Sequence, residues 1–141
     1  MDSNIENAAG LLLFNAGYVY RLLRKNSEQL NVSWTQITLL KDIEMHAPIT
    51  QKELAKINHM SGPSVSVATN KMIQQGFVKR TTNASDKRSS TLSLTLKGQQ
   101  KLDKDGDKLQ ACLMPLLEQL SKSELNNLVK SELCLAKEFL R

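Results

Sequence analysis

The segment GFVKRTTNASDKRSSTLSLTLKG, residues 76–98, shows the clearest structural pattern in the chain. Residues 77–81 and 91–95 are rich in β-forming side chains, and in the second run apolar and hydroxyl residues alternate, as in a strand with one buried face. The nine residues between them, 82–90, are mostly polar or charged and include no large apolar group. This pattern predicts a two-stranded β-hairpin with an exposed basic tip.

Two short helices are predicted directly before this hairpin. Thr50 begins a capping box, so the first helix starts there and ends near Asn58. Ser61 can cap the second helix, and Gly76 marks its end. The side chains expected to face the core are Leu54, Ala55, Ile57, Val65, Ala68, Met72 and Ile73. A helix, a tight turn and a second helix with a small polar outer face form a helix-turn-helix, whose second helix enters the major groove of DNA, and the hairpin makes it a winged one.

The remaining helices flank this head. Apolar residues recur every three or four positions over 5–23, and a further helix is expected from a capping box at Ser33 to residue 46. Downstream, Thr95 can cap a fifth helix, and Ser121 begins a sixth that continues to the chain end. These helices carry more apolar surface than a small head can bury. We therefore expect the two chain ends to pack together and to bury the surplus against a second copy of the chain.

The net charge of +5 is concentrated in one block of the chain. Residues 1–60 contain six basic and six acidic residues, and residues 101–141 contain seven of each. Residues 61–100 contain six basic residues and a single acid, Asp86. Summed like charges on one face attract polyanions, although a solvated basic surface without a ligand is the alternative.

The composition indicates a single compact domain, or a small domain that completes its core with a partner. The chain has 141 residues, of which 40% are hydrophobic. Its longest apolar run, residues 8–14, is far too short to span a bilayer, and no charged and apolar leader opens the sequence, so we expect neither membrane insertion nor secretion. Two cysteines, Cys112 and Cys134, are too few for a disulfide framework and lack metal-ligand spacing. We expect both to be buried and the protein to be cytoplasmic.

Three motifs mark the hairpin and its flanks. Residues 76–80 read Gly-Phe-Val-Lys-Arg, residues 86–88 read Asp-Lys-Arg, and residues 94–98 read Leu-Thr-Leu-Lys-Gly. In this order and spacing they resemble the wing motifs of the MarR family of transcriptional regulators, and the likeness extends over nearly the whole chain. The resemblance implies a mainly α-helical fold with a small two-stranded β wing. The domains it implies are an N-terminal dimerisation helix (1–32), a winged helix-turn-helix DNA-binding domain (33–98) and C-terminal dimerisation helices (99–141).

The resemblance also implies residue roles in DNA binding. Arg88, at the wing tip, would enter the minor groove, and Asp86 is close enough to orient its guanidinium; the alternative is an exposed salt bridge. Asn70 is the candidate for reading adenine, and Val67 stands where many members of the family carry an arginine. Lys71 is expected to contact a backbone phosphate. The same contact is expected from Lys52, Lys79 and Arg80, for which a solvated surface is the alternative. The full set of candidate DNA contacts is Lys52, Ser61, Ser64, Ser66, Val67, Asn70, Lys71, Lys79, Arg80, Asp86, Lys87 and Arg88.

Other kinds of site have little support in the sequence. The alternating acids of 103–107 start like a calcium loop, but Lys108 and Met114 occupy the positions that require Gly and Glu, so charged helix surface is the better interpretation. His46 and His59 lack a second ligand at helical spacing, so no metal site is expected. No arrangement of nucleophile and base, and no Gly-rich phosphate loop, indicates an enzyme or a cofactor.

The resemblance further implies an effector. Many members of the family bind small phenolic or other anionic molecules between the dimer helices and the DNA-binding lobe, and the candidate lining residues here are Tyr18, Arg21, Lys25 and Trp34. Structural packing is the alternative for the two aromatic residues. The sequence thus predicts a homodimeric DNA-binding transcriptional regulator that recognises a pseudo-palindromic duplex, represses transcription and is released by a small molecule. The alternatives are a winged-helix protein-interaction module that docks an acidic partner, and a redox sensor that acts through the two cysteines.

Overall fold

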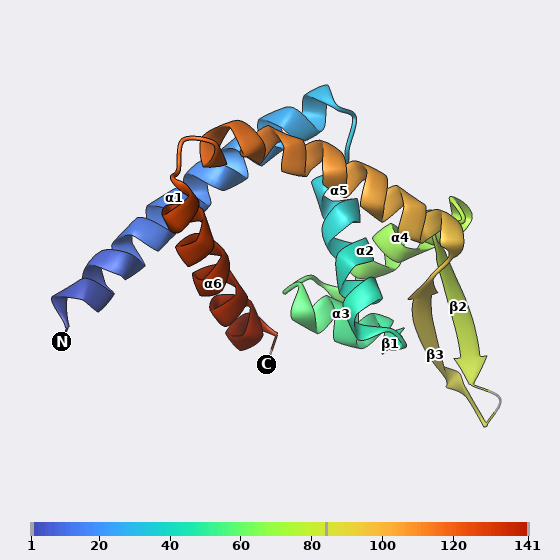
Figure 1. Cartoon of the computed structure of the whole chain (residues 1–141). Coiled ribbons are helices and arrows are strands. Elements are labelled where there is room, and N and C mark those ends of the chain that lie inside the picture. Colours follow the sequence, from blue (N-terminus) through green and yellow to red (C-terminus); the bar gives the residue numbers. More distant parts are fainter. Residues whose placement is uncertain (1, 84, 141) are drawn as a thin grey trace.

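The computed structural model describes residues 2–83 and 85–140; the side chains of Asn83, Asp86, Lys87 and Arg88 lie outside that description. Its elements in chain order are α1 (Ser3–Gln29), α2 (Trp34–His46), β1 (Ile49–Thr50), α3 (Gln51–Ile57), α4 (Gly62–Gln74), β2 (Val78–Asn83), β3 (Asp86–Leu94), α5 (Leu96–Leu117) and α6 (Lys122–Phe139). Figure 1 shows a head made of α2, α3, α4, the sheet and the start of α5, and an extended part in which α1 and α5 run side by side. The predicted mainly helical fold with a small β wing is confirmed.

Hydroxyl side chains cap the helices where the sequence predicts them. Each cap accepts a hydrogen bond from the backbone N–H three residues later, and these caps are Ser33, Thr50, Ser61, Thr95 and Ser121. The reciprocal capping box is present at Thr50 and Ser121. At Ser33 the box is only half formed, because the side chain of Gln36 turns away and its Nε2 donates to Gln75 Oε1 at 3.0 Å. The start of α2 is predicted correctly, whereas its capping box is not.

One apolar core holds the head together. Its buried members are Leu39, Leu40, Ile43, Ile49, Leu54, Ala55, Val65, Met72, Val78, Leu92 and Leu102. Ile57 is a wrong prediction: its side chain is 42% exposed, because it is the last residue of a helix only seven residues long. Thr69 is an inward residue that the prediction omitted, and it is fully buried one turn after Val65. The other predicted inward residues of α3 and α4 lie in this core or pack against it.

The hairpin is longer and its loop tighter than predicted. β2 and β3 pair antiparallel from Val78 opposite Leu94 to Asn83 opposite Asp86. Most of the predicted nine-residue loop, 82–90, is therefore strand. The sequence hides this because a ribbon that projects from the head (Figure 1) has no buried face, so its residues show no alternation of apolar and polar side chains.

A third strand, β1, was not predicted. Ile49 pairs with Leu92 and Thr50 with Thr91, which gives the sheet order β1-β3-β2. A strand of two residues is too short to show a periodic pattern. Its pairing nevertheless joins the start of α3 to the base of the wing and so helps to set the position of the wing relative to the helix-turn-helix.

The terminal helices leave large apolar faces open. α1 packs on α5 through a small cluster of Leu23, Val32, Ile37 and Leu109. No residue of α6 is buried, and Leu133 at its middle is 61% exposed, so within a single chain the predicted packing of the two chain ends holds for α1 on α5 but not for α6. Exposed apolar residues of α1 include Ile5, Leu11, Leu12, Leu13, Phe14, Tyr18, Val19 and Tyr20. Burial against a second copy stays a prediction. Among the described helices, none combines the length and the apolar content that crossing a membrane requires.

The prediction for the cysteines is wrong in part. Cys134 is exposed on α6, and Cys112 is half-buried on α5. Both are free thiols. The Sγ of Cys112 lies 3.4 Å from the backbone oxygen of Lys108, one turn earlier in its own helix. The difference for Cys134 follows from the exposed position of α6 as a whole.

The prediction of charged helix surface at 103–107 fails at Asp105, which is only 2% exposed. Asp105 lies three residues after Leu102 and four before Leu109, and both leucines are buried, so helical periodicity turns it toward the interior. Lys101 Nζ lies 2.8 Å from Asp105 Oδ2 and balances the buried charge. The acid is thus part of the packing of α5.

Candidate nucleic-acid interface

The N-terminal turn of α4 presents a pair of hydroxyl groups. Ser61 Oγ donates to Ser64 Oγ at 2.8 Å and accepts the backbone N–H of Ser64 at 3.2 Å. Val67 follows on the same outer face, and its side chain is 71% exposed. Of the other candidates on α4, Asn70 and Lys71 are exposed and Ser66 is half-buried. The outer face of this helix is therefore narrow, mostly polar and free of acids, which suits a groove of duplex DNA.

Arg80 joins three elements at this surface. It lies on β2, and its Nη2 donates to Gln51 Oε1 on α3 at 3.0 Å and to Asn70 Oδ1 on α4 at 3.4 Å. Arg80 pairs with the buried Leu92 across the sheet and shares the face that Val78 turns to the core, which explains why its side chain points to α3 and α4. Two candidate DNA contacts, Asn70 and Arg80, thus contact each other.

Gln51 also belongs to this surface, although no sequence motif marks it. It is the first residue of α3, directly after the Thr50 cap, and it is half-buried. Its place at the start of the first helix of the helix-turn-helix was the only available indication. The sequence does not show that β2, 29 positions further along, returns Arg80 to within 3.0 Å of it.

The other cations of the basic block are divided between different surfaces. Lys79 precedes Arg80 on β2 and therefore points to the opposite face of the strand. Lys97 is in the first turn of α5, and its Nζ reaches the C-terminal end of α4, where it donates to the backbone oxygen of Gln75 at 2.9 Å. A cation at that end of a helix is stabilised by the helix dipole. The charge of Lys97 thus serves the packing of α4 rather than its outer face.

Lys71 lies at the margin of the outer face of α4. It borders a hollow of about 190 Å³ between α4 and the start of α2. The hollow is lined by Ser33, Thr35, Gln36, Leu39, Ala68, Lys71 and Met72. A cation at the edge of a reading helix is placed for a phosphate contact rather than for a base contact. Lys52, on α3, is exposed.

The wing tip carries the most specific sequence motif. The backbone of Asp86 opposes that of Asn83, so residues 86–88 begin β3 at the far end of the wing (Figure 1). The side chains of Asp86, Lys87 and Arg88 lie outside the described part of the chain. Their contacts with DNA remain predictions from the sequence.

The candidate effector residues are distributed over α1 and the start of α2. Tyr18 is 61% exposed, and the guanidinium carbon of Arg21 lies 4.7 Å from the centre of its ring. Lys25 is exposed on the same helix. Trp34 packs against the cluster that joins α1 to α5. None of the four lines a described cavity in this single chain.

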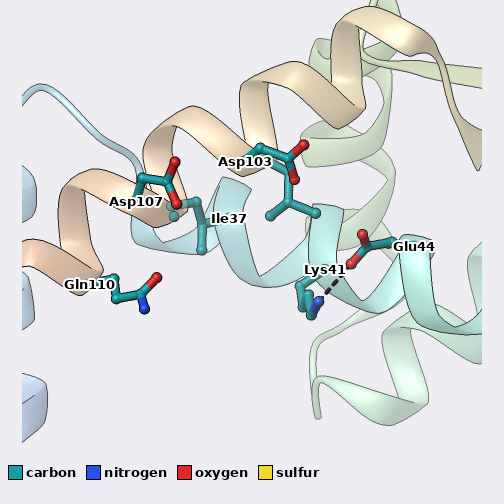
Figure 2. Close-up of a pocket in the computed structure, with 8 residues that line it drawn as sticks. Ile37, Lys41, Glu44, Asp103, Asp107 and Gln110 are labelled. Carbon is teal, nitrogen blue, oxygen red and sulfur yellow. Dashed lines mark hydrogen bonds and ion pairs between the residues drawn. The ribbon is translucent and has the colours of Figure 1, made fainter.

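A cavity of about 290 Å³ lies between α2 and α5 (Figure 2). Its lining residues are Ile37, Lys41, Glu44, Leu102, Asp103, Gly106, Asp107 and Gln110. Three of these are carboxylates, and the one cation, Lys41, is paired with Glu44 at 2.7 Å between Nζ and Oε2. The lining is therefore acidic overall, which does not suit the phenolic or anionic effector that the resemblance implies.

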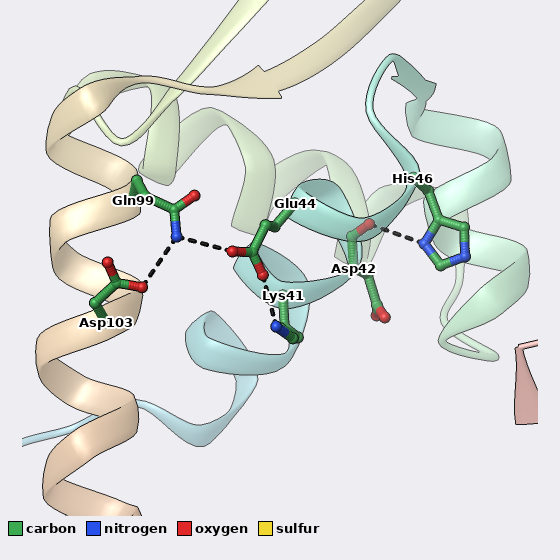
Figure 3. A network of polar contacts seen from close by, with 6 residues as sticks. All are labelled: Lys41, Asp42, Glu44, His46, Gln99 and Asp103. Atoms are coloured by element: carbon green, nitrogen blue, oxygen red, sulfur yellow. Dashed lines mark hydrogen bonds and ion pairs between the residues drawn. The ribbon is translucent and has the colours of Figure 1, made fainter. Parts of the chain in front are cut away.

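A polar network beside this cavity ties the head to α5 (Figure 3). Gln99 Nε2 donates to Glu44 Oε1 at 2.8 Å and to Asp103 Oδ1 at 3.0 Å. The hydrogen bond from Lys41, and then that from Gln99, lower the pKa of Glu44 below its ordinary value. This carboxylate accepts from Lys41 on its own helix and from Gln99 on α5, and so it holds α2 against the helix that leads to the C-terminal part of the chain.

Both histidines have structural surroundings. His46 Nδ1 lies 3.0 Å from the backbone oxygen of Asp42, one turn earlier in α2 (Figure 3). His59 occupies the turn between α3 and α4 with a left-handed backbone, φ 50°. Within the described residues, no group of three or more His, Cys, Asp or Glu side chains is arranged to hold a metal ion.

Comparison with known proteins finds the same fold. The family model named "MarR family" matches residues 32–90. Similar solved structures include a mutant of MarR from E. coli (24% identity, 94% of this chain and 96% of that chain, TM-score 0.75) and YusO from Bacillus subtilis (20% identity, 97% and 99%, TM-score 0.68). A mutant of MepR from S. aureus bound to an oligodeoxyribonucleotide is also similar (23% identity, 95% and 98%, TM-score 0.63). At these identities the likeness to solved structures establishes the fold. No curated protein matches the sequence.

Proposed function

Because this chain belongs to the MarR family of DNA-binding transcriptional regulators through its winged helix-turn-helix, residues 32–90, we propose that it is a homodimeric repressor that binds a pseudo-palindromic operator. One observation carries the proposal: α4 exposes a narrow polar face beside α3 and a basic wing, within the block that contains the whole charge excess of the chain. Members of this family regulate transcription and are not enzymes.

In the proposed complex, α4 lies in the major groove and the wing reaches the adjacent minor groove. Ser61, Ser64, Ser66, Val67 and Asn70 then face base edges or nearby phosphates, and Lys52, Lys71 and Lys79 contact the backbone. Two heads related by dimer symmetry bind half-sites about 10 bp apart. We place this activity in the cytoplasm, together with the DNA that it regulates.

Footprinting on the DNA that flanks its own gene tests the proposal. We expect one protected site with two half-sites about 10 bp apart. Replacement Arg88→Ala should weaken binding by about 1–3 kcal/mol, because it removes an arginine from the minor groove. Lys104→Ala, which removes an exposed cation from α5, is the control and should bind normally. Absence of protection at low ionic strength would contradict the function, and full affinity of Arg88→Ala would exclude the wing tip from the contacts.

The proposed dimer buries the open faces of α1 and α6 against a second copy. Leu133→Glu should raise the dimer dissociation constant about tenfold or more, because a charge would replace an apolar side chain in the interface. Ser131→Glu adds the same charge on the opposite side of α6 and should leave the dimer intact. Sedimentation equilibrium measures both variants. If Leu133→Glu dimerises as strongly as the unchanged chain, α6 does not form the interface.

We also propose that a small aromatic anion releases the protein from DNA. The support is the exposed pair of Tyr18 and Arg21, in which an aromatic face and a guanidinium already lie 4.7 Å apart on α1. Lys25 and Trp34 complete the candidate set. The acidic cavity between α2 and α5 is excluded from this role by the charge of its lining.

A further inference from the structure

We propose that Arg80 is a positioning residue for sequence recognition: its guanidinium holds the amide of Asn70 in the one orientation from which that amide reads adenine. The inference rests on the proposed binding of DNA through α4. It assigns to Arg80 a role different from the phosphate contact that its charge alone predicts. The support is the junction at which Gln51, Asn70 and Arg80 bring together α3, α4 and β2.

The first step is the hydrogen bonding of one nitrogen. Nη2 of Arg80 carries two protons, and two side-chain amide oxygens accept from it: Gln51 Oε1 at 3.0 Å and Asn70 Oδ1 at 3.4 Å. Both protons are thus used inside the protein. The nitrogen that faces α4 is therefore engaged with the reading helix before DNA arrives.

The second step is the choice between the two orientations of the Asn70 amide. Turning a side-chain amide over exchanges its oxygen and nitrogen with little change in shape, so only hydrogen bonding decides between the two. In the reversed orientation, Nδ2 of Asn70 would face Nη2 of Arg80, and two donors would oppose each other. Arginine has no acceptor and does not lose its proton in proteins, so it selects the orientation with Oδ1 toward β2.

Once its orientation is fixed, the Asn70 amide still has hydrogen-bonding groups free for DNA. Oδ1 of Asn70 accepts one hydrogen bond from Arg80 and keeps its second lone pair, and Nδ2 keeps both protons. An acceptor and a donor side by side are what adenine N6 and N7 require. Because the amide is oriented before binding, less conformational freedom is lost in the complex than with a freely rotating side chain.

The test separates positioning from charge by the replacement Arg80→Lys, which keeps the positive charge but not the planar fork of donors. The unchanged full-length chain first selects a duplex from a randomised library. Binding of Asn70→Ala to single-base versions of that duplex then identifies the position that Asn70 reads. At that position, the ratio of the affinity for the preferred base to the affinity for the other bases should be about tenfold smaller for Arg80→Lys than for the unchanged chain. Its salt dependence should equal that of the unchanged chain, because the same number of phosphates is neutralised.

Three further variants control the result. Lys79→Gln should weaken binding to all versions equally and reduce the salt slope by about 1 for each phosphate that it no longer neutralises. Gln51→Met removes the other acceptor of Nη2. It should reduce the same base preference, but by less than Arg80→Lys does. This variant still tests the inference if Arg80→Lys does not fold. In the Asn70→Ala background, Arg80→Lys should cause no further loss of preference, since the two residues act as one unit.

Several outcomes would overturn the inference. An intact base preference in Arg80→Lys would do so, and so would a loss that is equal for all duplexes or additive with that of Asn70→Ala. In each of these cases the unchanged chain still binds DNA, so the proposed function survives. If the unchanged chain selects no duplex at low salt, the proposed function itself fails, and the role of Arg80 fails with it.

Discussion

Replacing Gly98 by alanine should lower the free energy of unfolding by about 3 kcal/mol, which corresponds to a fall of about 10 °C in melting temperature for a chain of this size. Gly98 lies in the first turn of α5, where its backbone N–H donates to the Thr95 cap at 3.0 Å. A Cβ at this position would lie 1.9 Å from the backbone oxygen of Phe77 and 2.8 Å from its carbonyl carbon. Contacts as short as these force the backbone to move.

Hydrogen bonds around Phe77 oppose that movement of the backbone. The same oxygen of Phe77 accepts the backbone N–H of Thr95 at 3.0 Å, and the Thr95 hydroxyl donates to the backbone oxygen of Gly76. Separating α5 from Phe77 would therefore break the hydrogen bonds that anchor α5 to the base of the wing. Gly98, the last residue of the Leu-Thr-Leu-Lys-Gly motif, is thus required by the close approach of two backbones.

The matched control is Gly106→Ala in the same helix. A Cβ at Gly106 meets no atom within 4 Å, and alanine favours a helix by about 1 kcal/mol over glycine, so this variant should be as stable as the unchanged chain or more stable. Thermal unfolding followed by circular dichroism measures both. A melting temperature of Gly98→Ala equal to that of the unchanged chain would show that α5 and Phe77 separate without cost.

Raising the salt concentration from about 50 to about 200 mM should weaken binding to the operator by about 1,000-fold or more. The physical reason is the release of counterions from each phosphate that a cation neutralises. Cations available to backbone phosphates in each head are Lys52, Lys71, Lys79 and Lys87. A dimer that uses three of them in each head makes about six contacts, the range in which such a loss is observed.

Titrations at several salt concentrations, followed by fluorescence anisotropy of a labelled duplex, measure this slope. Lys71→Gln should make the slope shallower by about 1 for each phosphate left without its lysine. Lys97→Gln is the control from the same basic block, because its ammonium is held at the C-terminal end of α4. Its slope should equal that of the unchanged chain. A slope near zero on duplex DNA would favour the alternative function, a winged helix that docks a protein partner.

The sequence predicts a structural feature well when the interacting residues are close together along the chain. The helix caps, such as Thr50 and Ser121, were correct because each hydroxyl bonds to a backbone N–H three positions away. β1 was missed because its pairing with Leu92 joins residues from distant parts of the sequence. The length of the wing was missed for another reason: a ribbon without a buried face has no periodic pattern.

The candidate DNA surface was predicted residue by residue but not as an arrangement. Their chemistry marks Asn70 and Arg80 as candidates, but the sequence does not show that they contact each other and that Arg80 contacts Gln51. The sequence predicts one basic surface for the whole charge excess, whereas the ammonium of Lys97 lies against the C-terminal end of α4. Charge counts along a chain cannot distinguish these cases, because they do not show which way each side chain points.

The residue order was sufficient to establish a winged helix-turn-helix with a basic wing and long flanking helices, since helix caps, apolar periodicity and charge blocks are properties of neighbouring positions. Three-dimensional packing alone set the orientation of the Asn70 amide, the need for Gly98 and the burial of Asp105. Each of these depends on groups that meet only after the sheet and α5 have folded onto the helices. The strength of such contacts depends on distances between atoms in space, and a local sequence pattern does not give those distances.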